Sequence, residues 1–444
     1  MGNFLVFISR FLFGNSILHN ISFALIYVML FDYLWENFEA VYFAYMGVIY
    51  VSDFAHRLIG YFFAIYPIIF YRGLRNASSW VSVILYYFGY VPVILGLCLD
   101  IPINSGIDIY SYYVVLSISM SLFFLADRRK IVLSSFKSGK KIDEVWIWRI
   151  IVLFILLLFV TYAGNIRLVN FKEIYQLREE NAAVTSSFMG YVYSWCANFF
   201  FPFVFCYGLI KKSKFFIVAG SILFVFLFSI MGQKSDVFAP VILFILYRVI
   251  LWQDKYKTNV MGPISLGLLV ISIYLLNNLD SDSSYEIAGL LFSRTLGVGA
   301  YHVPMYLDFF KNHPYTYFSH INIINAITNS YPYSQSIGEM VAGDGSNSNA
   351  IFWLMDGVAS CGVWGVGIIS FIVFYFLMLL NGICNNNNKY FVYTIILMPM
   401  VALVNVSFFT TVLSKGILFI FLTIGFVKIS LVRDDHYERH IKLV

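Results

Sequence analysis

The chain has 444 residues, of which 60% are apolar and 12% are charged, whereas an ordinary soluble domain carries about 25% charged residues. A mean hydropathy of +0.79 and a formal net charge of +5 exclude a soluble catalytic domain and indicate an integral membrane protein. The pI of about 8.7 reflects basic loops beside a membrane, so nucleic acid is not an expected partner.

Apolar runs long enough to cross about 30 Å of hydrocarbon recur along the whole chain, and each needs about 20 helical residues. The predicted spans are 16–35, 56–72, 79–98, 109–126, 146–164, 188–210, 214–231, 237–252, 260–277, 350–380, 390–406 and 409–431. The shorter apolar segments 4–13 and 38–51 are compatible with interfacial helices, so the count ranges from about eleven to fourteen. The expected fold class is all-α and polytopic, with about twelve transmembrane helices in one integral membrane domain over residues 1–444.

Basic residues indicate the orientation of the chain. Of the 29 Lys and Arg residues, 21 lie at the ends of the chain or in one set of loops; they are Arg10, Arg72, Arg75, Arg128, Arg129, Lys130, Lys137, Lys140, Lys141, Arg149, Lys211, Lys212, Lys214, Arg248, Lys255, Lys257, Lys389, Lys428, Arg433, Arg439 and Lys442. The positive-inside rule makes this side, with both termini, cytoplasmic. The outer side carries Arg57, Arg167, Lys172, Arg178, Lys234, Arg294, Lys311 and Lys415.

The five cysteines lie in or at the ends of predicted spans, and their spacing matches neither a disulfide framework nor a zinc site. We expect no metal and no other cofactor. A "DSD" sequence at residues 280–282 leaves open a metal-dependent transferase. The N-terminus lacks a short apolar core followed by a small-residue cleavage site, so it is expected to be retained.

The outer side also holds a short polar turn between two apolar runs, "MGQKSDVFAP" at residues 231–240. Lys234 and Ser235 in this turn are suited to binding phosphate, with the ammonium acting as a point charge. The alternative is a capped turn in which Lys234 pairs with Asp236. The turn by itself does not decide between the two.

Two outer segments are longer than ordinary connections: residues 165–187, which contain Arg167 and Arg178, and residues 278–349. Loops of this length are usually functional or disordered, and the second is rich in aromatic residues and histidine, unlike a disordered tether. It contains Arg294, His302, His313 and His320. We therefore expect residues 278–349 to form a folded cap with short helices.

The cap leads into "SNSNAIFWLMDGVASCG" at residues 346–362, where one acid lies inside an apolar run. On a continuous helix, Asn349, Trp353, Asp356 and Ser360 fall on one face, which predicts a polar stripe at the start of the tenth span. An ionised carboxylate inside a membrane is costly unless it faces a wet cavity or a cation, so Asp356 marks a candidate site. The alternative is a structural carboxylate tied to an Arg or a backbone amide.

Three motifs together resemble those of bacterial O-antigen and capsule repeat-unit polymerases of the Wzy type. They are "GQKSD", "SRTLGVGAYHVPMYLDFFKNHPYTYFSH" and "SNSNAIFWLMDGVASCGVWGVG", which cover residues 231–240 and 293–367. The resemblance implies a GT-C-like membrane glycosyltransferase in the inner membrane, with the large loop between the ninth and tenth helices on the periplasmic side. Its implied substrates are oligosaccharides on undecaprenyl diphosphate, with membrane lipids and a chain-length regulator protein as further partners.

The resemblance also implies roles for particular residues. Arg294 and Lys234 become candidate contacts to the diphosphate, with Arg167 and Arg178 as further basic contacts from the outer loops. Asn349 becomes a candidate glycan contact. Asp356, His302 and His313 become the candidate catalytic residues, because a carboxylate or a histidine can orient or deprotonate an acceptor hydroxyl.

Two rival functions remain open beside the polymerase. A ligase that moves finished glycan onto lipid A core shares this topology. A polysaccharide flippase or other transporter is expected to place ionisable residues near the midplane of several spans, whereas the charges here gather at the outer ends.

Overall fold

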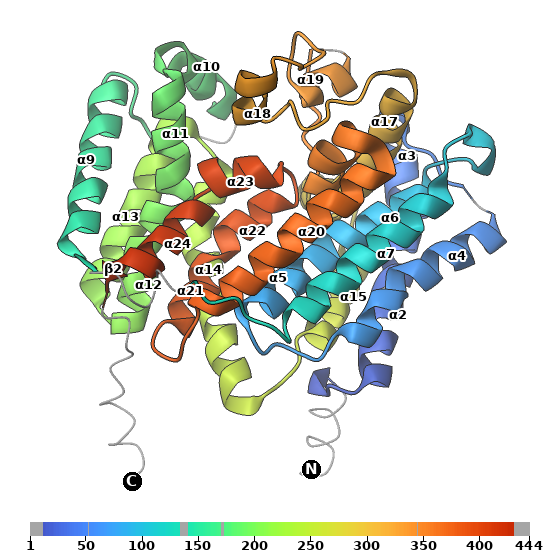
Figure 1. Ribbon diagram of the computed structural model, residues 1–444, viewed down its shortest axis with the longest axis horizontal. Helices are drawn as coiled ribbons and strands as arrows, with labels where there is room; N and C mark the ends of the chain where they lie inside the picture. Colours follow the sequence, from blue (N-terminus) through green and yellow to red (C-terminus); the bar gives the residue numbers. More distant parts are fainter. Residues whose placement is uncertain (1–11, 52, 134–140, 170–172, 344, 430–444) are drawn as a thin grey trace. The chain divides into compact units, whose positions relative to one another are not determined.

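The computed structural model describes residues 12–51, 53–133, 141–169, 173–343 and 345–429 (Figure 1). Helices dominate these residues, and the strands found in them are β1 (Ile142–Asp143) and β2 (Val427–Lys428), which pair in parallel. Some basic residues used for the orientation lie outside the described ranges, namely Arg10, Lys137, Lys140, Lys172, Arg433, Arg439 and Lys442.

Eight helical segments in the described ranges are long and apolar enough to cross a membrane. They are α2–η1–α3 (Ile17–Tyr42), α5–η4–α6 (Ala77–Leu99), α7 (Ile109–Ala126), α9 (Val145–Tyr162), α11–η6–α12 (Ser187–Lys211), α13 (Lys214–Met231), α14 (Lys234–Tyr256) and η8–α20 (Trp353–Ile383). The pair α23 (Phe408–Ser414) and α24 (Ile417–Phe426), bent by 52°, is a ninth candidate. The prediction of an all-α polytopic membrane protein is thus confirmed.

Three other predicted spans correspond to shorter apolar segments: α4–η3 (Phe54–Phe70), α15 (Met261–Leu276) and α21–α22 (Lys389–Leu403). Each of the twelve predicted spans therefore overlaps one helical segment. Since these three are short for a full crossing, the count of twelve stays a prediction. The sides of the membrane on which the loops lie also stay predictions.

The chain divides into two compact units. The first unit comprises residues 1–130, 256–378 and 403–409, and the second comprises residues 131–255, 379–402 and 410–444. Of the candidate site residues, Arg294, His302, His313, Asn349 and Asp356 belong to the first unit. Arg167, Arg178 and Lys234 belong to the second.

The core of the first unit is rich in buried tyrosines whose hydroxyls bind backbone carbonyls. Tyr27 donates to the carbonyl of Tyr87 at 2.5 Å, Tyr86 to that of Ala64 at 3.1 Å, and Tyr90 to that of Phe63 at 2.6 Å. A buried hydroxyl without a partner is costly, so these bonds let large aromatic side chains fill an apolar interior.

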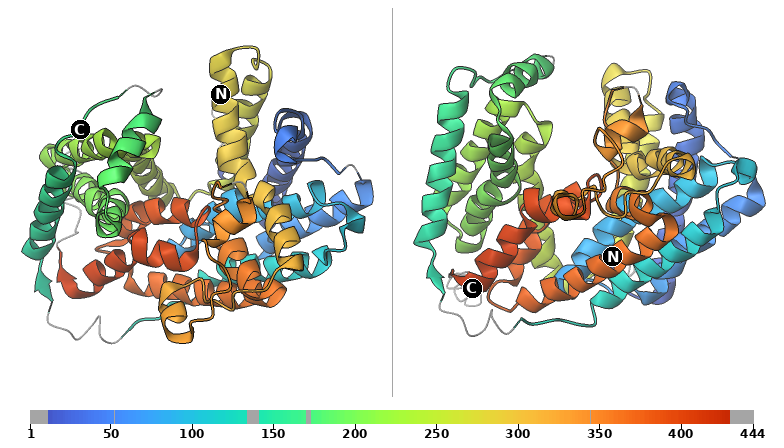
Figure 2. Two further views of the ribbon diagram at one scale, coloured as in Figure 1. Left: turned by 90° about the horizontal axis from the view of Figure 1, so that it is seen from above. Right: turned by 45° about the horizontal axis from the view of Figure 1, so that its top comes forward.

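The segment predicted to form a cap does contain short helices, namely α16 (Asp282–Ala288), η7 (Gly289–Gly297), α17 (Val298–Asn312), α18 (Asn322–Thr328) and α19 (Ile337–Ala342). One of them, α17, packs directly on α6 (Val91–Leu99). A Cβ atom on Gly96 would lie 2.7 Å from the Cα of Ala300, so the two backbones touch. Figure 2 shows this yellow to orange segment beside the cyan helices of the same unit.

The second unit is built around the antiparallel pair α12 (Phe201–Lys211) and α13. The turn between them passes through Lys212 in the left-handed region, with φ of 53°. Trp148 of α9 stacks on Phe216 and meets Tyr207 edge-on. Helix α10 (Ile174–Val184) packs against α13 in the same unit.

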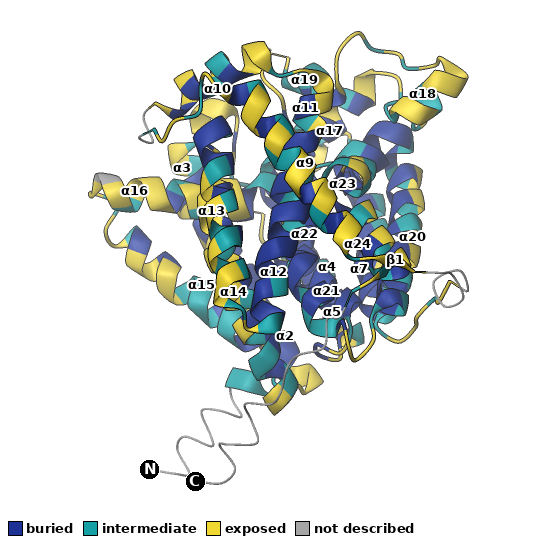
Figure 3. Ribbon diagram, turned by 90° about the vertical axis from the view of Figure 1, so that its left-hand side faces the viewer, coloured by how far each residue is buried: buried dark blue, intermediate teal, exposed yellow. Residues whose placement is uncertain are grey.

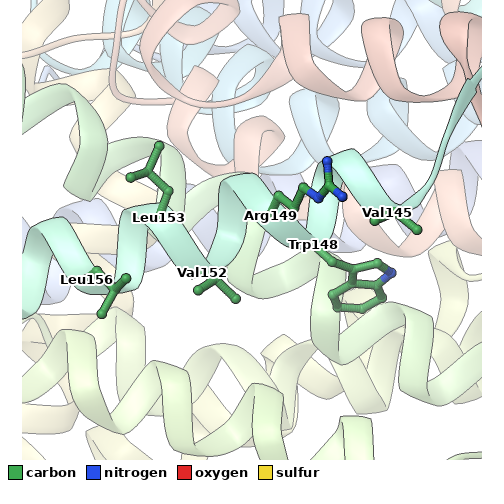
Figure 4. Close-up of a pocket in the computed structure, with 6 residues that line it drawn as sticks. All are labelled: Val145, Trp148, Arg149, Val152, Leu153 and Leu156. Atoms are coloured by element: carbon green, nitrogen blue, oxygen red, sulfur yellow. The ribbon is translucent and has the colours of Figure 1, made fainter.

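Much of α9 is exposed and apolar, as Figure 3 shows in yellow. Val145, Trp148, Arg149, Val152, Leu153 and Leu156 line a shallow pocket along this helix (Figure 4). The guanidinium of Arg149 lies 4.8 Å from the ring centroid of Trp146. An apolar helical face with an Arg and a Trp at one end is typical of a lipid-facing span near the membrane surface.

Candidate functional site

The fully buried carboxylate of Asp356, on η8 (Trp353–Val358), is the centre of a polar cluster in the first unit. Its Oδ1 lies 3.0 Å from His320 Nε2 and accepts a hydrogen bond from Ser407 Oγ at 2.6 Å. Its Oδ2 accepts a hydrogen bond from the backbone N–H of Phe408 at 2.6 Å. The carboxylate thus contacts His320, the Ser407 hydroxyl and the Phe408 N–H, and these contacts offset the cost of burying it.

His320 is held at both ring nitrogens. While Nε2 faces Asp356, Nδ1 lies 3.0 Å from Thr316 Oγ1, and the side chain is only 9% exposed. Thr316 Oγ1 also lies 3.0 Å from the carbonyl oxygen of Ala359. A continuous series of polar contacts therefore runs from Ala359 through Thr316 and His320 to Asp356.

A sharp break in the helix carries Asp356 to this position. Cys361 and Gly362 have non-helical backbone angles, and Gly362 has a φ of 58°. Beyond the break, residues 363–383 remain helical, while residues 353–360, here called the arm, fold back on them. Trp353 donates its indole N–H to Ser370 Oγ at 2.9 Å, a contact that a straight helix would not allow.

The predicted polar stripe is therefore wrong. Asn349 is exposed in the irregular stretch before the arm, Trp353 turns to Ser370, and Asp356 turns to His320. The π-helical geometry of η8 and the break at Cys361–Gly362 both end the regular 3.6-residue periodicity on which the stripe was based.

The break also supplies the anchor for the turn that carries His320. A helix end leaves carbonyl groups without helical partners, and here the carbonyls of Ala359 and Ser360 accept the backbone N–H groups of Thr316 at 2.8 Å and Tyr317 at 3.1 Å. The turn closes with a bond from Ser319 N–H to the Thr316 carbonyl at 2.9 Å. The break and the position of His320 are thus parts of one arrangement.

Two polar atoms on the segments flanking Asp356 are buried and have no hydrogen-bond partner in the described structure. They are Ser360 Oγ, on the arm, and Asn405 Oδ1, two residues before Ser407. Unsatisfied buried polar atoms are uncommon and costly. A hydroxyl-rich ligand is one kind of partner that would satisfy them.

The two histidines expected to be catalytic lie in other surroundings. His302 is buried on α17, where its Nδ1 lies 2.8 Å from the Val298 carbonyl, and burial lowers its pKa. His313 is exposed, with its ring stacked on Phe309 at 4.0 Å and its Nδ1 2.9 Å from the Phe309 carbonyl. The histidine that the structure brings to Asp356 is His320.

The expected basic contacts are divided between the units. In the first unit Arg294 is exposed on η7, with no ion pair or hydrogen bond to any described residue. In the second unit Arg178 donates to the carbonyls of Met231 at 3.0 Å and Gly232 at 3.2 Å, and Arg167 pairs with Glu180 at 2.7 Å. Arg178 thus holds α10 to the end of α13, and Arg167 ties the preceding loop to α10.

Lys234 is exposed in the first turn of α14. Nearby Asp236 is buried and accepts a hydrogen bond from Tyr193 at 2.5 Å, within the electrostatic field of Lys415 and Arg178. Tyr193 is therefore a hydrogen-bond partner of Asp236 that the sequence did not suggest. Lys234 remains a candidate phosphate contact.

Sequence reasoning missed Thr316 and Ser407, and it gave no reason to prefer His320 to the other loop histidines. Ser and Thr residues beside apolar runs are common, so nothing in the sequence marks these two as neighbours of Asp356 or His320.

The chain matches no family model, and neither curated proteins nor solved structures show a significant similarity to it.

Proposed function

We propose that the chain is a glycosyltransferase of the bacterial inner membrane that joins oligosaccharide repeat units carried on undecaprenyl diphosphate at the periplasmic face. The observation that carries this proposal is the buried His320–Asp356 pair, together with the unsatisfied Ser360 Oγ and Asn405 Oδ1 on the chain segments that carry Asp356 and Ser407. The motif resemblance at residues 231–240 and 293–367 supplies the substrate class. Membrane lipids and a chain-length regulator protein are the further partners of this proposal.

The reaction needs a group that accepts the proton of the attacking sugar hydroxyl. The hydroxyl oxygen bonds to the anomeric carbon of the donor, the bond from that carbon to the diphosphate oxygen breaks, and the lipid diphosphate leaves with the electron pair. His320 is suited to take the proton at Nδ1, because Asp356 holds its Nε2–H and the Thr316 hydroxyl hydrogen can turn from Nδ1 to the Ala359 carbonyl, which frees the lone pair. Ser407 and the Phe408 N–H keep the carboxylate in position.

Negative charge develops on the leaving diphosphate, and a planar guanidinium stabilises it through two parallel hydrogen bonds. Arg294 fits this role, since no described residue engages its exposed side chain. Arg167 and Arg178 fit it less well, because their guanidinium groups already bind Glu180 and the end of α13. Lys234 and Asn349 remain candidate contacts to diphosphate and glycan.

The test compares Asp356→Asn, His320→Gln and His313→Gln in a strain whose own copy of the gene is deleted. We expect Asp356→Asn and His320→Gln to accumulate normally yet yield mainly single-repeat glycan, because the proton acceptor or its holder is lost. His313→Gln should give the wild-type distribution, since His313 is exposed and apart from the pair. Glycan banding on gels provides the measurement. Wild-type chain lengths from Asp356→Asn would refute the proposed role of the pair.

A transporter of the same lipid-linked glycan is the second candidate, and the broken helices favour it. Helix α20 breaks at Cys361–Gly362, and α23 meets α24 at a 52° bend. Interrupted helices with a buried ionisable group are typical of transporters. Single-repeat glycan at the cell surface after gene deletion would support the polymerase, whereas total loss of surface glycan would support a flippase or a ligase.

A further inference from the structure

We propose that Thr316 is a positioning residue that lets His320 carry either one or two protons, by turning its single hydroxyl hydrogen between His320 Nδ1 and the Ala359 carbonyl. The inference rests on the proposed function, in which His320 accepts the proton of the attacking sugar hydroxyl. Thr316 would stabilise the protonated imidazole of His320 after the proton has been transferred.

The geometry gives Thr316 two alternatives of equal length. Its Oγ1 lies 3.0 Å from His320 Nδ1 and 3.0 Å from the Ala359 carbonyl oxygen. The residue is 1% exposed, so water does not compete for the hydroxyl. Its backbone N–H donates separately to the Ala359 carbonyl at 2.8 Å, which fixes the residue without involving the side chain.

Counting hydrogens shows why a hydroxyl suits this position. When His320 is neutral, Nε2–H donates to Asp356, and the Thr316 O–H donates to the lone pair on Nδ1. When His320 gains a proton at Nδ1, the new N–H donates to Thr316 Oγ1, and the hydroxyl hydrogen turns to the Ala359 carbonyl. Both states leave every donor of the pair matched, and only the hydroxyl rotor moves.

A side chain without this rotor would satisfy neither state. Valine has nearly the shape of threonine but can neither donate to the neutral imidazole nor accept from the charged one. The loss is larger for the charged state, because hydrogen bonds to ionised groups are stronger than neutral ones. Thr316→Val should therefore disfavour the protonated imidazole that follows proton transfer.

The Ala359 carbonyl is available as the second partner because of the helix break. In a continuous helix it would accept the N–H of the residue four positions later, but the backbone turns away at Cys361 and Gly362. It instead accepts the N–H and the hydroxyl of Thr316. The helix break thus supplies the carbonyl to which the Thr316 hydroxyl donates when His320 carries two protons.

The experiment compares Thr316→Val with Thr316→Ser, which keeps the rotor, and with Thr328→Val as the matched control. Thr328 is exposed, and its hydroxyl contacts the Ile324 carbonyl and Ser330 but no histidine. We expect Thr316→Val to slow polymerisation by about 10- to 100-fold, with Thr316→Ser near wild type and Thr328→Val unchanged. All three variants are assayed at equal amounts of folded protein in the membrane.

A spectroscopic readout tests the geometry independently of activity. Solid-state NMR on histidine-15N protein in lipid, with His320→Gln to assign the signals, should show a neutral His320 protonated at Nε2 and accepting a hydrogen bond at Nδ1. Thr316→Val should change the Nδ1 signal, and Thr316→Ser should restore it. Protonation of the neutral ring at Nδ1, or an unchanged Nδ1 signal in Thr316→Val, would overturn the inference.

The two proposals fail in different ways. If Asp356→Asn and His320→Gln stop polymerisation while Thr316→Val polymerises at the wild-type rate, the proposed function stands and the role of Thr316 is refuted. If Asp356→Asn polymerises normally, the proposed role of the His320–Asp356 pair fails, and the NMR result still decides whether Thr316 sets the hydrogen bonding of His320.

Discussion

Two neighbouring residues, Tyr317 and Phe318, both have left-handed backbone angles, with φ of 47° and 65°. Turns with two such central residues normally use Asn or Gly, because larger L-residues cost about 1–3 kcal/mol each in this region. The turn persists because Thr316 and Tyr317 are anchored to the Ala359 and Ser360 carbonyls. Strain is thus concentrated in the turn that presents His320, as is common at functional sites.

Asp100, one residue beyond α6, makes stability depend on pH. Its Oδ1 accepts the Ile49 N–H at 2.8 Å, and burial raises its pKa to about 7, an effect that the Ile49 hydrogen bond partly opposes. Because the folded pKa exceeds the unfolded value of 3.8, the folded state binds the proton more tightly. This contribution is fully present below pH of about 4 and is lost as the pH rises through about 7.

We therefore expect the thermal unfolding midpoint of purified protein to fall between pH 5 and pH 8, and to fall less in Asp100→Asn, whose amide does not titrate. Asp308→Asn, at an exposed position of the same unit, is the control and should keep the wild-type difference. Equal pH dependence in Asp100→Asn and wild type would show that Asp100 contributes none of it.

At the scale of the element, the arm depends on close approach of two backbones. A Cβ atom on Gly365 would overlap the carbonyl oxygen of Gly357, a backbone atom that no side-chain rotation can move away. A Cβ atom on Gly367 would lie 3.6 Å from Val115 Cγ2, an ordinary contact. The two glycines are therefore not equivalent, although the sequence presents them as similar.

Gly365→Ala should displace the arm and destabilise the protein by about 1–3 kcal/mol, the usual cost of overpacking. Gly367→Ala, the matched control, should be close to neutral. Thermal unfolding in detergent measures both, and the proposed polymerase activity should be lost only in Gly365→Ala. A neutral Gly365→Ala would mean that the arm does not fold back on α20 in the membrane.

At the scale of the whole molecule, the distribution of charges predicts which side of the membrane each loop occupies. A reporter fused after Arg129 or at the C-terminus should be cytoplasmic, and one fused within residues 300–330 should be periplasmic. Paired alkaline phosphatase and green fluorescent protein fusions measure this, because each is active on only one side. A cytoplasmic result for residues 300–330 would remove the His320 turn from the periplasmic face and with it the proposed reaction.

Each span predicted from hydropathy overlaps a helical segment of the described chain, because burial in lipid requires long apolar runs. It could not reveal the break at Cys361–Gly362, since the residues on both sides are as apolar as those of a straight helix. Asp356 stood out because a charge in such a run is rare, whereas its partners did not. His320 and Ser407 lie 36 residues before it and 51 after it, and tertiary packing alone brings them together.

The anchoring of the His320 turn on the arm has a consequence for how the site opens. The carbonyls that the turn uses exist as free acceptors only while the helix is interrupted, and straightening that helix would withdraw them. The His320 turn and the arm are therefore one cooperative unit, whose backbone amides should exchange with solvent together in a single opening event. Opening of this unit would separate His320 from Asp356, so the pair exists only while the turn is seated on the arm, and a bound sugar can react only after the turn has closed again.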